Sequence, residues 1–207
     1  MKPSGKLGAV ALGLVCCSIT LAHCATTDTN ISAPSWAQKI EKPGLPNFHL
    51  VTTNLYRGAQ PTAEGMTELK KLGVRTVINL RSFHSDKDEA SNTGLKLVRF
   101  TTQPWDSDDK DVIAFLKVMA DTNNLPAMVH CQRGADRTGL MCAMYRVVYC
   151  GWEKKDAIEE MKNGGFAFYR GWKNQLRYIG KADVEKLKLK AGISSGTVVP
   201  RLGSKPN

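Results

Sequence analysis

Hydrophobic residues recur along the chain in two different patterns, and segments with one pattern alternate with segments that have the other. Short apolar or β-branched runs predict strands, whereas apolar residues three and four positions apart predict helices. The predicted strands cover residues 48–51, 55–57, 74–80, 95–100 and 127–130. The predicted helices cover residues 61–73, 112–119, 138–150, 152–161 and 171–189. This alternation predicts an α/β domain with a central, mainly parallel sheet of about four or five strands, flanked by helices.

The segments on either side of this region lack the periodicity. Residues 26–47 are rich in Thr, Ser, Pro and Asn and predict an irregular lead-in. Residues 191–207 contain Ser, Gly and Pro without an apolar period, which is typical of a disordered tail. The folded domain is therefore expected at residues 48–190. Its helix over 138–150 is apolar on nearly every side, so we expect that helix to be buried.

The N-terminal residues 1–25 have the pattern of a signal peptide. Lys2 and Lys6 form a basic start, and Leu7–Leu21 is an uncharged apolar run that is too short for a stable membrane span. We therefore expect an exported protein, located in a bacterial periplasm or secreted. Lipid attachment at Cys24 is the less favoured alternative, because a bulky histidine precedes that cysteine.

Composition and charge narrow the classes of partner. The 207 residues are 42% hydrophobic and 23% charged, which is typical of a globular protein and excludes a polytopic membrane protein. Lys and Arg number 29 against 19 Asp and Glu, and the net charge of +10 favours anionic partners such as phosphate esters, nucleic acids or acidic membranes. The lysines of 181–190 alternate with apolar residues, as on a solvated helix face, and basic residues are not interleaved with aromatic ones. We expect no nucleic-acid partner and a monomeric protein.

Three cysteines lie beyond the expected signal peptide: Cys131, Cys142 and Cys150. An odd number without a CxxC pair predicts neither a disulfide framework nor a zinc site. Cys142 and Cys150 fall in the apolar helix and are expected to fill the core. His49 and His84 show no spacing with carboxylates that indicates a metal site, and the chemistry described next needs no metal or other cofactor.

Cys131 opens a loop between a predicted buried strand and a predicted buried helix. Such a loop gathers backbone N–H groups at a helix N-terminus, which favours anions. A thiol there loses its proton more easily than a free thiol, and its thiolate can attack phosphorus. Arg137, six residues later, can bind two phosphoryl oxygens and stabilise the charge of the transition state. Gly134 leaves room for the oxygens, and Thr138 offers a hydroxyl to the departing sulfur, so the residues predict hydrolysis through a cysteinyl-phosphate.

The loop sequence HCQRGADRTG, residues 130–139, resembles the HCxxGxxR[ST]G signature of the protein tyrosine phosphatase superfamily, in its dual-specificity branch. LYRGAQPT, LGVRTVINLR and GWEKKDAIEEMKNGGF resemble segments of bacterial members and, more distantly, of plant and fungal enzymes that act on inositol pyrophosphates. The resemblance covers roughly residues 50–187. It implies a cysteine-dependent phosphatase whose substrate is a phosphorylated protein, with small phosphate esters, inositol phosphates or phosphoinositides as alternatives.

The resemblance also implies a general acid, which the family takes from an Asp in a loop upstream of the cysteine. Pro104-Trp105-Asp106 contains the residue types of the family's WPD loop in a different order, so Asp106 is the predicted acid. Asp108 and Asp109 remain alternatives, although both precede a predicted helix and suit its N-terminal cap.

Five residues of the loop are expected to contact substrate: Gln132, Arg133, Gly134, Ala135 and Asp136. Arg133 supplies a cation beyond the one that the chemistry requires. Gln132 and Ala135 stand where phosphoinositide phosphatases commonly carry lysine, which weakens the lipid alternative. Asp136 is expected to form an ion pair that shapes the loop, and it is a third alternative for the acid.

Two further classes stay open at this point. Rhodanese-like sulfurtransferases also carry a cysteine loop between a strand and a helix, and an inactive module could bind phosphate without hydrolysing it. The histidine before Cys131 and the Arg-Thr-Gly that ends the motif favour the phosphatase. Arg57 and Arg81 each follow a predicted strand and are expected to serve packing rather than substrate binding.

Overall fold

The computed structural model describes Met1 and residues 35–194. One sheet contains all of its strands: β1 Gln38–Lys39, β2 His49–Thr52, β3 Leu55–Gly58, β4 Thr76–Asn79, β5 Lys96–Arg99 and β6 Ala127–His130. Their order across the sheet is β1-β2-β3-β6-β4-β5. Strands β3, β6, β4 and β5 run parallel, and β1 and β2 join antiparallel at one side. The predicted fold class, an α/β domain with a mainly parallel sheet, is confirmed.

The sheet has six strands rather than the four or five that were predicted, because β1 lies in the segment expected to be irregular. Gln38 and Lys39 are exposed and pair with Leu50 and His49 of β2. A two-residue edge strand of polar side chains has no apolar alternation, so no sequence pattern marks it.

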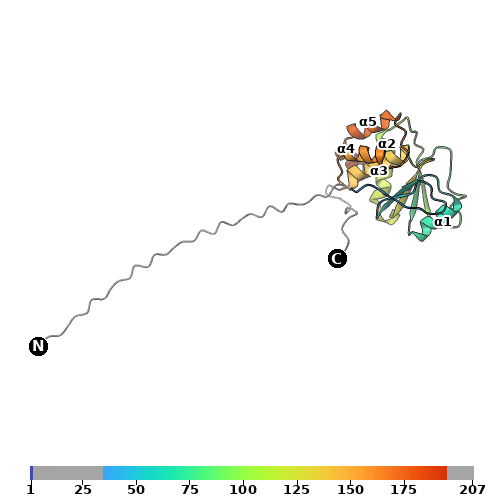
Figure 1. Cartoon of the computed structure of the whole chain (residues 1–207), viewed down its shortest axis with the longest axis horizontal. Helices are drawn as coiled ribbons and strands as arrows, with labels where there is room; N and C mark the ends of the chain where they lie inside the picture. The colour runs from blue at the N-terminus through green and yellow to red at the C-terminus, as the bar shows by residue number, and fades with distance from the viewer. Residues whose placement is uncertain (2–34, 195–207) are drawn as a thin grey trace. The chain divides into compact units, whose positions relative to one another are not determined.

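Helices cover both faces of the sheet: α1 Ala63–Lys71, α2 Asp109–Ala120, α3 Asp136–Tyr149, α4 Lys154–Asn163, α5 Lys173–Lys181 and α6 Val184–Ala191, with a 3₁₀ turn at Thr122–Asn124. Neighbouring residues of a strand face opposite sides of the sheet. Met128 packs with Met66 and Leu69 of α1 on one side, whereas Val129 belongs to a larger core with residues of α2 to α6. Figure 1 shows α1 on one side of the sheet and α2, α3, α4 and α5 on the other.

Helix α3 is buried from Thr138 to Tyr149, as its sequence predicted. It carries one charged residue in that stretch, Arg146, whose Nη2 and Nε lie 2.7 and 3.0 Å from the two carboxylate oxygens of Glu160 in α4. The ring of Trp152 covers the guanidinium at 4.2 Å from its centroid. A bidentate partner and an aromatic face satisfy this buried cation, so Arg146 ties α3 to α4.

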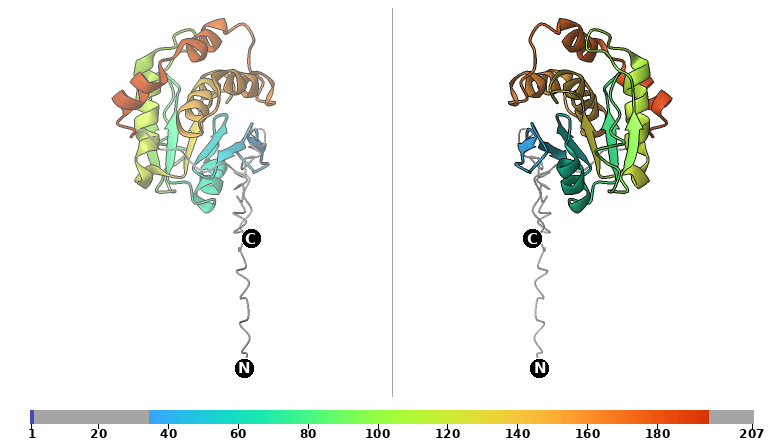
Figure 2. Two further views of the ribbon diagram at one scale, coloured as in Figure 1. Left: turned by 90° about the vertical axis from the view of Figure 1, so that its left-hand side faces the viewer. Right: turned by 90° about the vertical axis from the view of Figure 1, so that its right-hand side faces the viewer.

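The helix predicted over 171–189 is two helices, α5 and α6. Asp183 separates them, because its side chain accepts a hydrogen bond from the backbone amide of Lys186 and so caps α6. Figure 2 shows α6 beside α2. Helix α6 includes Ala191, which the sequence assigned to the tail, and residues 195–207 of that predicted tail lie outside the described residues. The predicted signal peptide also lies outside them, apart from Met1.

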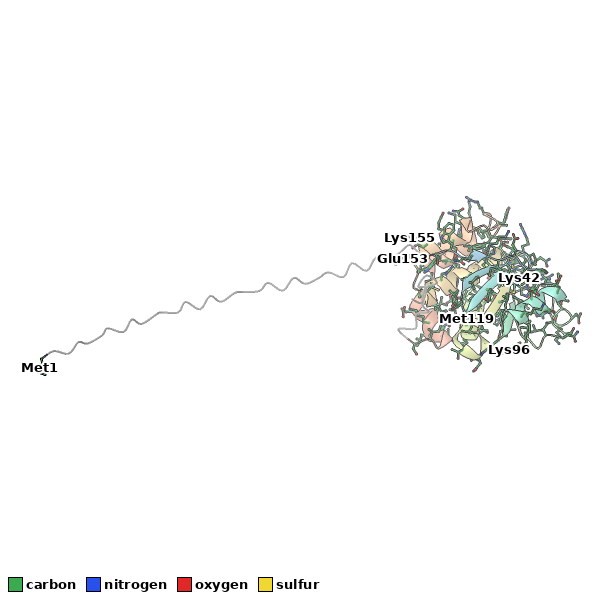
Figure 3. The ribbon with its side chains drawn as sticks, turned by 60° about the horizontal axis from the view of Figure 1, so that its bottom comes forward. Met1, Lys42, Lys96, Met119, Glu153 and Lys155 are labelled. Atoms are coloured by element: carbon green, nitrogen blue, oxygen red, sulfur yellow. The ribbon has the colours of Figure 1, made fainter. Side chains whose placement is uncertain are left out.

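Charged side chains extend from the edges of the described domain, as Figure 3 shows for Lys96 and Lys155. Among the described helices, none has the length and the apolar character needed to cross a membrane.

Candidate active site

The cysteine loop, residues 131–135, joins β6 to α3. His130 ends β6 in register with Gly58 of β3 and Asn79 of β4, so the loop leaves the carboxyl end of a central parallel strand. Helix α3 begins at Asp136, and no side chain caps it. The first amides of an uncapped helix lack partners within the helix, and they point toward the loop together with the positive end of the helix dipole.

The carbonyl groups of this loop are held from outside. The donors are the amide of Gln60 to Gln132 (3.4 Å), Nδ2 of Asn47 to Arg133 (2.9 Å), and Nη2 of Arg57 to Gly134 (2.8 Å) and to Ala135 (3.4 Å). In a trans peptide the C=O and the following N–H point in opposite directions. The amides of residues 133–136 therefore point into the loop, and within residues 35–194 none of them donates to a backbone group. Four inward amides form an anion-binding site.

Arg57 lies beneath this loop. It is 1% exposed, and its guanidinium stacks on the ring of Phe166 at 3.5 Å from the centroid. Burial lowers the pKa of Arg57 below its usual range. Arg57 serves packing, as the sequence favoured: it orients the loop from behind. Arg81 likewise donates to the side chain of Gln60, at 2.9 Å.

Gly134 is the residue that the loop backbone requires. Its φ is +69°, and a Cβ there would lie 2.4 Å from the carbonyl carbon of Gly58 and 2.5 Å from the amide nitrogen of Ala59. Only glycine combines this left-handed conformation with so close an approach to β3.

Cys131 and Arg137 line one pocket of about 320 Å³, together with Pro104, Gln132, Arg133, Asp136, Tyr169 and Trp172. Cys131 is 3% exposed. Nη1 of Arg137 donates to the carbonyls of Leu80 (3.0 Å) and Thr102 (3.3 Å), which leaves Nε and Nη2 without a partner among the described residues. Two N–H groups of one guanidinium match two phosphoryl oxygens.

The structure thus brings together most of the predicted site residues. Gln132, Arg133 and Asp136 line the pocket, whereas Gly134 and Ala135 are buried in the loop and contribute their amides. Thr138 is fully buried in the first turn of α3, and its hydroxyl has no hydrogen-bond partner among the described residues. Its assistance to sulfur departure stays a prediction.

Asp106 does not line the pocket that holds Cys131. It is exposed in a turn closed by a hydrogen bond from its own amide to the carbonyl of Gln103, and it shares a separate, small cavity with Arg137. Pro104 of the same turn does line the Cys131 pocket. The turn therefore lies beside the pocket, and the role of Asp106 as acid stays a prediction.

The two alternative aspartates have structural partners. Asp108 caps α2 by accepting from the amide of Asp111 at 3.0 Å. Asp109 accepts from Lys186 Nζ at 2.7 Å and from the hydroxyl of Tyr178 at 3.1 Å. The hydrogen bond from Lys186, helped by that from Tyr178, holds the pKa of Asp109 below its usual range. A general acid must be protonated at its working pH, so this environment disfavours Asp109.

Asp136 makes a different contact from the ion pair that the sequence predicted. Its Oδ1 accepts from the backbone amide of Tyr169 at 2.8 Å, and the described residues show no ion pair for it. This bond fixes the α4–α5 loop, residues 164–172, against the first turn of α3. Because its carboxylate holds a backbone group, Asp136 is also a poor candidate for the acid.

The α4–α5 loop supplies two pocket residues that sequence reasoning missed. Tyr169 and Trp172 line the pocket, with their rings edge to face at 5.9 Å between centroids. Tyr169 is 59% exposed. The aromatic residues that follow Gly164 and Gly165 are the signal that could have found them, since glycines mark a loop and aromatic residues in loops often bind. Sequence spacing indicated no metal site at His84, but the structure brings His84 beside Asp86 and Glu89, with ligand atoms within 4.8 Å of one another.

Residues 42–171 match the family described as DSP-PTPase phosphatase fused to NAD+ kinase. The chain belongs to the DSP-PTPase family of phosphatases. The dual specificity protein phosphatase TpbA of Pseudomonas aeruginosa is 36% identical over 170 residues, which cover 81% of this chain and 75% of TpbA. Inositol diphosphatase DSP5 of Arabidopsis thaliana is 32% identical over 152 residues, which cover 69% of this chain and 72% of DSP5.

Solved structures agree with this membership. The crystal structure of TpbA matches with a TM-score of 0.69 and 32% identity, covering 77% of this chain and 98% of that one. The catalytic domain of SIW14 from S. cerevisiae matches with a TM-score of 0.63, covering 72% of this chain and 93% of that one, and at 22% identity it shows the fold alone. The family match and the similarity to TpbA confirm a cysteine-dependent phosphatase, in preference to the sulfurtransferase and the inactive module.

Gly134→Ala is expected to lower kcat/KM for p-nitrophenyl phosphate by about 10²-fold, because the added methyl group displaces the loop amides by a fraction of an ångström or more. Gly151→Ala is the matched control. Gly151 has a similar φ of +66°, but a Cβ there meets no atom within 4 Å. The measurement is kcat/KM of both variants by steady-state kinetics. Equal values for the two variants would contradict the requirement for glycine at position 134.

Proposed function

We propose that this enzyme hydrolyses aryl phosphomonoesters of the phosphotyrosine type, with Cys131 as nucleophile. The observation that carries the proposal is the presence of Cys131, Arg137 and the inward amides of the cysteine loop at one pocket. A thiolate, a guanidinium with two unpartnered N–H directions and a ring of amides together bind and polarise a phosphoryl group.

The reaction proceeds in two displacements. The thiolate of Cys131 attacks phosphorus, the ester P–O bond breaks, and the carboxylic acid of Asp106 gives its proton to the leaving oxygen. Arg137 and the loop amides bind the three equatorial oxygens. A water molecule then attacks the cysteinyl-phosphate, gives a proton to the Asp106 carboxylate, and releases inorganic phosphate and the thiolate, whose sulfur accepts a hydrogen bond from Thr138.

The walls of the pocket favour an aromatic substrate. Tyr169, Trp172 and Pro104 present apolar surface, which suits a flat ring. Arg133 is the lining cation other than Arg137, whereas a polyphosphorylated inositol needs several. TpbA supports this choice, since a variant of it has been crystallised in complex with pTyr, at 31% identity and a TM-score of 0.68 to this chain. The plant relative, named an inositol diphosphatase, supports the alternative substrate.

We also propose that the enzyme is monomeric and exported to the periplasm or beyond. The support for export is the basic start and apolar run within residues 1–25. An exported phosphatase encounters phosphate esters outside the cytoplasm, and a lipid anchor at Cys24 would keep it at a membrane surface.

Cys131→Ser is expected to abolish phosphate release from p-nitrophenyl phosphate, because a serine hydroxyl does not ionise in the range where a thiol does. The measurement is release of p-nitrophenolate without added metal. Cys142→Ser is the control, since burial raises the pKa of the Cys142 thiol to about 11 and keeps it inert. Retained activity in Cys131→Ser would remove the proposed mechanism.

Asp106→Asn is expected to lower kcat for a phosphotyrosine peptide by about 10²-fold, since the leaving oxygen then departs without a proton. Asp109→Asn, the control from the same segment, is expected to leave kcat near the wild-type value. The pH profile of kcat between pH 5 and 8 separates the two variants. A normal profile for Asp106→Asn with a defective one for Asp109→Asn would assign the acid to Asp109.

Tyr169→Ala is expected to lower kcat/KM for a phosphotyrosine peptide by about fivefold, because a ring contact of roughly 1 kcal/mol is lost, and to change hydrolysis of a small alkyl phosphate little. The control is Trp36→Ala, an aromatic residue that does not line the pocket. Phosphate release is measured over a panel of phosphopeptides, phosphoinositides and soluble inositol phosphates. A preference for the inositol phosphates, unaffected by Tyr169→Ala, would overturn the aryl assignment.

A further inference from the structure

The acid turn, residues 103–106, has little packing of its own. Trp105 is 65% exposed, and Asp106 is also exposed. The turn is closed by the hydrogen bond from the amide of Asp106 to the carbonyl of Gln103, at 3.2 Å. Exposed side chains bury little apolar surface, so hydrogen bonds to neighbouring elements decide where this turn lies.

The entry to the turn is held by the β4–β5 loop, residues 80–95. Nε2 of Gln103 donates to the hydroxyl of Ser82 at 2.9 Å, and that hydroxyl donates to the carbonyl of Thr102 at 3.3 Å. These bonds fix the chain up to Gln103. The residues that follow, including the predicted acid, depend on other contacts.

Two side-chain amides of helix α5 hold the next residue of the turn. Asn174 and Gln175 are the second and third residues of α5. Nε2 of Gln175 lies 3.0 Å from the carbonyl oxygen of Pro104, and Nδ2 of Asn174 lies 3.1 Å from the same oxygen. Nδ2 of Asn174 also lies 3.4 Å from the hydroxyl of Ser107. A carbonyl oxygen has two lone pairs, so the two amides use the full acceptor capacity of Pro104.

The Pro104 carbonyl belongs to the peptide group that precedes Trp105. Because a peptide group is planar, a fixed carbonyl also fixes the direction in which the chain enters Trp105. Asp106 is the next residue. The α5 amides therefore fix the backbone from which the side chain of the predicted acid extends.

The burial of Gln175 shows that its amide does little for stability. Gln175 is fully buried, and its Oε1 has no hydrogen-bond partner within residues 35–194. A buried acceptor without a partner costs at least as much free energy as one neutral hydrogen bond contributes. The unpaired Oε1 thus offsets the bond that Nε2 makes. An unbranched apolar side chain such as methionine would fill the position without that cost, but it would not hold the turn.

We propose that Asn174 and Gln175 are positioning residues, which hold the acid turn so that Asp106 can protonate the leaving oxygen. The inference rests on the proposed function, in which Asp106 is the general acid. Neither amide lines the pocket that holds Cys131, so their effect passes through Pro104, which does line it. Trp172, directly before α5, lines the same pocket, so the start of α5 connects the pocket wall to the acid turn.

Two substrates that differ in their need for an acid provide the test. Phenyl phosphate, like phosphotyrosine, releases a strongly basic oxygen, whose conjugate acid in tyrosine has a pKa of about 10. The nitro group of p-nitrophenyl phosphate stabilises the departing phenolate, so this substrate needs the acid less. For both substrates, kcat/KM covers the steps up to release of the leaving group. The ratio of the two kcat/KM values, phenyl over p-nitrophenyl, therefore reports acid catalysis.

Gln175→Met and Asn174→Ala each leave one donor at Pro104, and the double variant leaves none. We expect the ratio to fall about threefold in each single variant and about tenfold in the double variant, because the acid is then held less well. The fall is expected to stay below that of Asp106→Asn, which removes the acid itself. The melting temperature of Gln175→Met is expected to equal or exceed that of the wild type, since the unpaired Oε1 is gone.

Asn124→Leu is the matched control for loss of a buried amide. Asn124 is 4% exposed, and its Nδ2 donates to the carbonyl of Val118 at 2.9 Å. It lies in the turn before β6, whereas the cysteine loop follows β6. Asn124→Leu is expected to change the melting temperature and to leave the ratio at the wild-type value. A double variant whose ratio equals that of this control would overturn the proposal. The single variants answer the same question if the double variant does not fold.

Asp106→Asn, measured with the same two substrates, separates this inference from the proposed function. An unchanged ratio in Asp106→Asn would count against Asp106 as the acid, and the positioning role would fall with it. A lowered ratio in Asp106→Asn together with a wild-type ratio in the α5 variants would refute the positioning role alone. Loss of all activity in Cys131→Ser supports the nucleophile in either case.

Discussion

The site depends on the outward anchoring of the carbonyl groups in the cysteine loop. Without those hydrogen bonds, the peptide groups of this five-residue loop could point either way. Binding of an anion would then have to order the loop, and the lost conformational entropy would weaken binding. The donors are Asn47 before β2, Arg57 within β3 and Gln60 after β3. The inward amides are therefore arranged by the fold before any phosphate arrives, which is what electrostatic stabilisation of a transition state requires.

Two buried arginines, Arg146 and Arg57, differ in their partners and therefore in their roles. Arg146 meets the carboxylate of Glu160 at 2.7 Å, so its charge is neutralised locally and contributes little field elsewhere. Arg57 has carbonyl oxygens and the Phe166 ring as partners, and the described residues offer it no carboxylate within ion-pair distance. Its guanidinium instead faces the back of the cysteine loop, where it donates to the carbonyls of Gly134 and Ala135.

The sequence predicted the parts of this enzyme that depend on local pattern. The alternation of strands and helices, the buried helix α3 and the cysteine loop could be predicted, because each is set by residues close together in the chain. Contacts between residues far apart in the sequence could not be predicted. Asp86 lies 44 residues from His130, and Asn47 lies 86 residues from Arg133, so no periodicity links either pair. The edge strand β1 and the break at Asp183 were missed for a related reason. Each is set by one or two residues, and patterns averaged over a longer segment do not show them.

The α4–α5 loop connects the chemical part of the site to its recognition part. Asn47 donates to the carbonyl of Arg133 in the cysteine loop and also to that of Phe166 at 3.1 Å, so one amide group holds both segments. Asp136 adds a second link through the amide of Tyr169. A third link lies at the predicted acid turn, whose Pro104 carbonyl accepts from Gln175 of α5 at 3.0 Å. The pocket wall, the cysteine loop and the acid turn share these backbone hydrogen bonds. Side chains on the wall can therefore vary to suit a substrate, while the hydrogen bonds keep the reacting groups in place.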